Sequence, residues 1–120
     1  MKFSFFEEYP TKGNLDKLKL IKFKTNLYLA AKSLKEFRKL EKQVKKYKNV
    51  KKIIYWPILH KEEGYWMSTF SSPFGLLRII NELKHNKKPL TILWDAEPPM
   101  LTKKLFLKNL FHIKLDISNE

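Results

Sequence analysis

Short apolar runs alternate along this chain with amphipathic segments of helical spacing, and this alternation is the feature that most restricts its fold. Apolar runs of about four to eight residues are typical of buried strands, whereas apolar residues at steps of three and four mark one face of a helix. The strands are expected at residues 3–6, 27–31, 50–59, 90–94 and 111–117, and the helices at 14–21, 34–47, 72–86 and 102–110. Asn14 is the expected cap of the first helix, Ser33 and Glu36 have capping-box spacing at the start of the second, and Asn49 can end the second in a left-handed conformation. Continuous apolar strands that alternate with helices predict a parallel sheet in an α/β protein.

The order of the strands decides between two architectures. Right-handed crossovers in sequential order place every helix on one side of the sheet, which gives half of a (β/α)8 barrel. A small doubly wound sheet, with helices on both sides, is the alternative. We favour the half-barrel because polar residues follow the strands directly, as functional residues do in barrels: Glu7 and Glu8, then His60 to Glu63, then Asp95 and Glu97.

Composition narrows the class of protein. The 120 residues predict a single domain, 1–120, and 43% hydrophobic residues suffice for one core. Cysteine is absent, which excludes disulfides, thiolate metal sites and cysteine nucleophiles. No glycine-rich phosphate loop occurs, so no cofactor is expected. No signal peptide and no apolar run of membrane-spanning length is recognised, so a cytoplasmic location without a membrane span is expected.

The formal net charge of +13 is concentrated between Lys32 and Lys52, where ten basic residues face only Glu36 and Glu41. One interpretation is a basic, non-catalytic module that binds nucleic acid or another polyanion. The other is an ordinary solvated helix face, since the chain has only two arginines, the residue best suited to phosphate and guanine recognition. The candidate polyanion-binding residues are Lys35, Arg38, Lys42, Lys45 and Lys46.

Two carboxylates follow the predicted fourth strand. Side chains alternate along a strand, so Asp95 and Glu97 are expected on the same face, close enough for the negative charge of one to raise the pKa of the other. A carboxyl group of that kind can donate a proton near neutral pH. The pair therefore predicts a general acid and its neighbour, with Pro98 and Pro99 stiffening the backbone just beyond them.

The stretch from Leu93 to Glu97, LWDAE, resembles the end of the fourth-strand D-x-E motif of barrel glycoside hydrolases of the chitinase-like and lysozyme-like kinds. The resemblance implies that Glu97 is the general acid and that Asp95 orients or stabilises the substrate. The chitinase-like motif has a further Asp where this chain has Leu93. Because a barrel needs about 250 residues, the resemblance implies a fragment, a degenerate relative or a homodimer that completes the sheet or barrel.

The remaining candidates surround this pair. Glu8, with Glu7 beside it, is the candidate second carboxylate, and a carbohydrate-like ligand would lie against flat aromatic rings. The candidate ligand-binding residues are Trp66, Tyr65, Trp56 and His60. His60, Glu62 and Glu63 could join the pair around a divalent cation, but they lack the spacing of a metal motif and no metal site is predicted. An inactive scaffold remains the third functional alternative.

Overall fold

The computed structural model describes residues 3–68 and 71–94. They contain the strands β1 (Phe3–Glu7), β2 (Thr25–Ala31) and β3 (Val50–Pro57), and the helices α1 (Lys12–Asp16), α2 (Leu34–Val44) and α3 (Pro73–Lys84). Short 3-10 helices cover Lys17–Leu20 and Lys61–Glu63. None of the helices in these ranges combines the length and the apolar character that crossing a bilayer requires.

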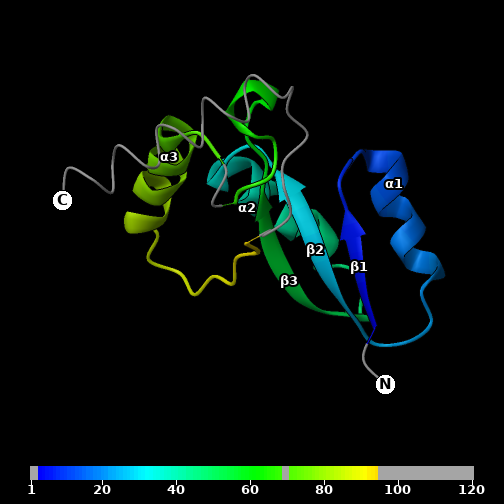
Figure 1. Ribbon diagram of the computed structural model, residues 1–120. Helices are drawn as coiled ribbons and strands as arrows, with labels where there is room; N and C mark the ends of the chain where they lie inside the picture. Colours follow the sequence, from blue (N-terminus) through cyan, green and yellow to red (C-terminus); the bar gives the residue numbers. More distant parts are fainter. Residues whose placement is uncertain (1–2, 69–70, 95–120) are drawn as a thin grey trace. The chain divides into compact units, whose positions relative to one another are not determined.

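The described residues form two compact units. The first contains the chain up to Pro57 together with Lys88–Leu93, and so holds the whole sheet with α1 and α2 (Figure 1). The second contains the described part of Ile58–Lys87 and Trp94, with α3 as its main element. The site of interest is built mainly on the first unit.

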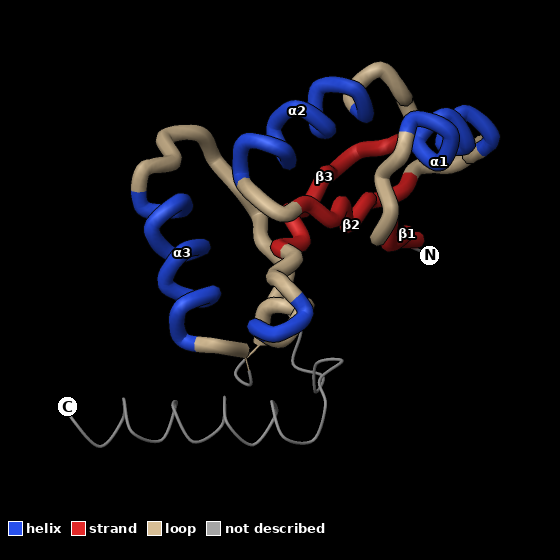
Figure 2. Tube along the Cα trace, turned by 90° about the horizontal axis from the view of Figure 1, so that it is seen from above, coloured by secondary structure: helices blue, strands red, loops and turns tan. Residues whose placement is uncertain are grey.

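The sheet has three parallel strands in the order β1-β2-β3. This result confirms the prediction of an α/β protein with a parallel sheet. The three strands form an open sheet rather than a barrel, and such a sheet is also consistent with the doubly wound alternative. Figure 2 shows α1 and α2 on the same face of the sheet, as right-handed crossovers between sequential strands require.

Helix α2 begins where the sequence predicts a capping box. The Ser33 hydroxyl accepts a hydrogen bond from the Glu36 backbone N–H at 3.1 Å, which is the N-cap half of the box. The Glu36 carboxylate accepts one at 2.8 Å from the N–H of Lys32, the residue before the N-cap. Phe37 and Val44 are fully buried and hold α2 against β2 and β3. The Phe37 ring lies 4.8 Å from that of Tyr55 between ring centroids, so α2 closes the core over the carboxyl-terminal part of β3.

Of the predicted fourth strand, residues 90–94, the structure shows a single β-bridge. Ile92 forms a parallel bridge with Tyr55, whose backbone N–H donates to Thr91 and whose carbonyl accepts from Leu93. The backbone thus occupies the next place in the sequential order, beside β3, without extending into a full strand. The residues expected to form the last helix and strand, 102–110 and 111–117, lie outside the described residues.

Local predictions fail at three points. The N-cap of α1 is Thr11, whose hydroxyl accepts from the Asn14 N–H, and not Asn14 itself. Asn49 is not left-handed as predicted, because Tyr65 is the one non-glycine residue with positive φ among those described. The Asn49 amide instead donates to the Ile21 carbonyl at 2.8 Å, which is a long-range contact that local spacing does not reveal. Strand β3 ends at Pro57, two residues before the predicted end.

In the second unit a short, heavily bonded loop packs on α3. The Glu63 carboxylate accepts two hydrogen bonds from Arg78, at 2.7 and 2.9 Å, and a third from the His60 N–H. A Cβ atom at Gly75 would lie 3.1 Å from a Glu63 carboxylate oxygen, so this carboxylate rests directly on the helix backbone. Ser72 and Pro73 begin α3 as predicted, although the Ser72 side chain makes no capping hydrogen bond.

Candidate functional site

The exposed side of α2 carries a continuous line of lysines. The buried residues Phe37 and Val44 fix which side of the helix faces the sheet, and steps of four, three and four residues place the lysines on the opposite side. All are exposed, the last in the turn just beyond the helix. We call this set the α2 lysine row: Lys35, Lys39, Lys42 and Lys46.

No described carboxylate neutralises the α2 lysine row. Among residues 3–68 and 71–94, ion pairs join Arg38 and Lys45 to Glu41, and Arg78 to Glu63, but include no member of the row. The row is about 16 Å long at the helical rise of 1.5 Å per residue. Four positive charges without a carboxylate partner therefore lie along one exposed side of the helix, and the Lys46 ammonium also lies 5.1 Å from the centroid of the Tyr47 ring.

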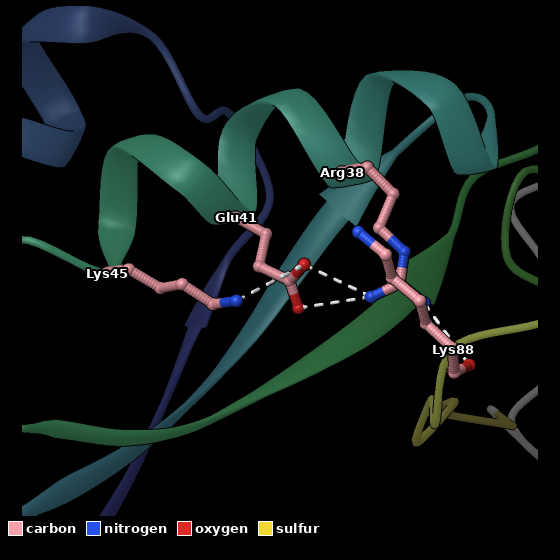
Figure 3. Close-up of polar contacts among 4 residues, drawn as sticks. All are labelled: Arg38, Glu41, Lys45 and Lys88. Carbon is pink, nitrogen blue, oxygen red and sulfur yellow. Dashed lines mark hydrogen bonds and ion pairs between the residues drawn. The ribbon is translucent and has the colours of Figure 1, made fainter.

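Arg38 and Lys45 have a different environment from the row (Figure 3). The Arg38 guanidinium donates to both Glu41 carboxylate oxygens, at 3.1 and 3.3 Å, and to the Lys88 carbonyl at 3.4 Å. The Lys45 ammonium lies 4.0 Å from the same Glu41 carboxylate. The structure thus separates the predicted set: Lys35 and Lys42 lie on the free face with Lys46, while Arg38 and Lys45 flank Glu41.

Lys39 belongs to the row although it was not among the predicted contact residues. Its position four residues after Lys35 and three before Lys42 was available from the sequence as a signal of a shared helix face. The predicted set includes Arg38 and Lys45, which lie off this face, and lacks Lys39, which lies on it. Helical phase is therefore the better guide to the surface.

A small cleft of about 320 Å³ opens beside the end of the row. It lies between α1 and the end of α2, with Lys12 on one side and Lys46 on the other. The Tyr47 hydroxyl lies in hydrogen-bonding contact, at 3.2 Å, with the Asp16 carboxylate inside it. Because Asp16 brings a negative charge into the cleft, the exposed row, which reaches the cleft only at Lys46, is the better anion contact.

The sheet face opposite α1 and α2 is aromatic. Phe6 and Tyr28 are partners in the β1–β2 register, and their rings stack at 4.4 Å with an angle of 7° between planes. The Trp56 ring meets Phe6 edge-on at 5.7 Å between centroids. Trp56, a predicted ligand contact, is itself only 7% exposed, whereas Phe6 is 60% exposed. Phe6 was not among the predicted ligand contacts.

The other predicted aromatic contacts lie in the loop of the second unit. Tyr65 and Trp66 are both half-buried and pack edge-to-face at 5.3 Å. The backbone of Trp66 is held by a bridge to Ile58, and its carbonyl accepts from the Ser71 hydroxyl at 2.8 Å. His60 is exposed at the start of the 3-10 helix. Tyr65 and Trp66 thus lie in a hydrogen-bonded loop and contact each other.

The charged side chains Glu63 and Arg78 join this loop to α3 through an ion pair. The hydrogen bonds from Arg78 lower the pKa of the Glu63 carboxyl below its ordinary value, with burial opposing them. Glu63 is therefore occupied as an ion-pair partner. Within the described ranges, no three histidine or acidic side chains lie close enough together to hold a metal ion.

The predicted catalytic pair, Asp95 and Glu97, lies outside the described residues. The candidate second carboxylate, Glu8, is half-buried just after β1, at the carboxyl end of the sheet as predicted. Comparison with protein families, with curated proteins and with solved structures finds no match to this chain. The functional argument therefore depends on the chemistry of the described surfaces.

Proposed function

We propose that this protein binds a polyanion along the outer face of α2, and that its ligand class is nucleic acid. The observation that carries the proposal is the α2 lysine row, four exposed ammonium groups in line without a described carboxylate partner. A net charge of +13 adds a long-range attraction for anionic ligands.

The spacing of the row suits a phosphate backbone. Side chains three and four residues apart on a helix have Cβ atoms about 5–6 Å apart. Double-stranded DNA carries one negative charge per about 1.7 Å of its axis, so a row of this length runs beside several phosphates. An ordinary solvated helix face has acidic groups interspersed with the basic ones, which the row lacks.

The residue type predicts the kind of recognition. Lysine is a compact point charge that contacts phosphates without reading bases, whereas arginine forms the bidentate contacts used for guanine. The one arginine of α2, Arg38, is engaged with Glu41 and the Lys88 carbonyl. We therefore expect binding that depends on charge and salt and little on sequence.

The experiment compares two variants that remove the same charge. Lys42→Gln with Lys46→Gln shortens the row, whereas Lys84→Gln with Lys87→Gln removes exposed lysines elsewhere. Fluorescence anisotropy with a labelled DNA duplex should show affinity falling several-fold more for the first pair than for the second. Equal losses would mean that overall charge, and not the row, attracts the ligand, and absence of wild-type binding would refute the proposal.

We also retain the half-barrel arrangement of the fold as a proposal. It is supported by the sequential order β1-β2-β3, by α1 and α2 sharing one face, and by the parallel bridge at Ile92, which continues the order past β3. Completion of the sheet or barrel by a second copy of the chain belongs to the same proposal. The expected cytoplasmic location and the hydrolase hypothesis stay predictions from the sequence.

A further inference from the structure

The aromatic sheet face ends at an exposed edge. Within the described residues β1 pairs with β2 alone, so no strand covers the outer side of Phe6. Tyr28 occupies the inner side of the Phe6 ring, in a nearly parallel stack at 4.4 Å. Phe6 nevertheless remains 60% exposed. Its outer side is thus the open end of an existing stack, onto which a further flat ring can be added.

Trp56 supports the stack from the neighbouring strand. Its ring reaches Phe6 across β2, which the small side chain of Ala30 in the intervening register position allows. The Trp56 indole N–H is buried and has no hydrogen-bond acceptor among the described residues. Trp56 therefore supports the stack by packing, and the exposed surface for a ligand belongs to Phe6.

A polar row runs beside the aromatic one. Ser4, Asn26 and Lys52 are register partners across β1, β2 and β3, on the same face as Phe6 and Tyr28. They lie two residues, or about 7 Å, along the strands from the aromatic row. Lys52 is exposed, and the Asn26 side-chain amide makes no hydrogen bond within the described residues. The face therefore offers a flat ring, an amide and a positive charge together.

We infer that this face binds single-stranded nucleic acid, with a base stacked on the outer side of Phe6, the Asn26 amide contacting a base edge and Lys52 contacting a phosphate. The inference adds a second contact, specific for single strands, to the proposed nucleic-acid binding, and it rests on the proposed function only for the class of ligand. The α2 lysine row lies on the other side of the sheet, so Lys52 supplies the local charge.

The positive charge of the protein favours a nucleotide base over a sugar ring as the ligand that stacks on Phe6. Both rings stack on aromatic side chains. A neutral oligosaccharide gains no attraction between opposite charges from Lys52 or from a net charge of +13, whereas each nucleotide carries a phosphate beside its base. Duplex DNA keeps its bases inside the helix and cannot present them to Phe6, so single strands are the matching form.

The chain offers a matched control for each residue. Phe3 lies on the same strand and is 45% exposed, but it faces the opposite side, with its ring 4.8 Å from Phe23. Lys51 is exposed and adjacent to Lys52, but its ammonium donates to the Lys48 carbonyl. The test variants are Phe6→Leu and Lys52→Gln, and their controls are Phe3→Leu and Lys51→Gln. Phe6→Tyr keeps the flat ring and controls for folding.

Three probes separate the contributions: single-stranded oligo(dT), inorganic polyphosphate of equal charge, and a neutral oligosaccharide of similar length. Phe6→Leu should lower the affinity for oligo(dT) by about ten-fold while leaving the affinity for polyphosphate unchanged. Phe6→Tyr and Phe3→Leu should both bind like the wild type. Lys52→Gln should weaken binding of oligo(dT) more than Lys51→Gln does.

The possible negative results distinguish the inference from the proposed function. Equal wild-type affinity for oligo(dT) and polyphosphate, or equal effects of Phe6→Leu and Phe3→Leu, would overturn the inference and leave the proposed function standing. Binding of oligo(dT) without any binding of polyphosphate or duplex would refute the α2 row and retain the stacking site. Competition by the oligosaccharide at concentrations similar to those of oligo(dT) would assign the face to sugars and overturn the inference.

Discussion

Replacing Glu63 by glutamine removes the charge that joins the loop of the second unit to α3. The wild-type carboxylate accepts hydrogen bonds from Arg78 at 2.7 and 2.9 Å and from the His60 N–H at 3.2 Å. The Glu63 side chain is 16% exposed and that of Arg78 is 41% exposed, so solvent screens part of the attraction. A bidentate, partly buried pair of this kind should contribute about 1–2 kcal/mol.

The pH dependence of this contribution has a definite sign. The pKa of the Glu63 carboxyl is lowered in the folded state, chiefly by the hydrogen bonds from Arg78. The stabilisation is therefore complete above the unfolded pKa of about 4.3 and is lost as the pH falls through the lower folded pKa. Urea denaturation of the wild type and Glu63→Gln should differ at pH 7, and the difference should shrink as the pH falls below about 4.3.

Glu62 supplies the matched control. It is an exposed carboxylate next to Glu63 in the chain, and Glu62→Gln should change the free energy of unfolding by less than about 0.5 kcal/mol. A Glu63→Gln effect as small as that of Glu62→Gln, or one that stays constant from pH 7 to pH 3, would refute the assignment of a stabilising ion pair. In a double-mutant cycle with Arg78→Gln, the two effects should not be additive.

Three further substitutions test the core, the helix cap and the predicted catalytic pair. Phe37→Ala removes a fully buried ring beside Tyr55 and should destabilise the protein by about 3–5 kcal/mol in chemical denaturation, and a loss below about 1 kcal/mol would contradict the packing of α2 on the sheet. Ser33→Ala removes the hydroxyl that accepts from the Glu36 N–H and should cost about 1 kcal/mol in the same assay, whereas no change would mean that the cap is dispensable. If the glycosidase-like hypothesis holds, Glu97→Gln should abolish turnover of chromogenic glycosides without altering the melting temperature, and a wild type inactive on such a panel, or a variant that keeps its activity, would contradict it.

The strands and helix α2 could be predicted because their signals are local. The Ser33–Glu36 capping box and the spacing of Phe37 and Val44 fix α2 from neighbouring residues alone. The Thr11 cap and the contact between Asn49 and Ile21 were missed. In the first case two residues compete as caps of one short helix, and in the second the partner is distant in the sequence.

The candidate site was predictable in part for a similar reason. The distribution of charge along the sequence locates the basic segment. The buried residues of α2 show which lysines share its free face. The ion pairs of Glu41 with Arg38 and Lys45 appear only in the structure. The aromatic face depends on strand register, which pairs Phe6 with Tyr28 across two separate strands. No spacing within either strand encodes that pairing, so single-strand patterns leave it undetermined.

The salt dependence of duplex DNA binding tests the central claim most directly. Each phosphate contacted by a lysine contributes about −0.9 to the slope of log K against log salt concentration, so four row contacts predict a wild-type slope of about −3.6 or steeper. Removing Lys42 and Lys46 together should make the slope shallower by about 1.8, whereas removing Lys84 and Lys87 should leave it nearly unchanged. A wild-type slope near zero, or identical slopes for the two double variants, would contradict polyanion binding by the α2 lysine row.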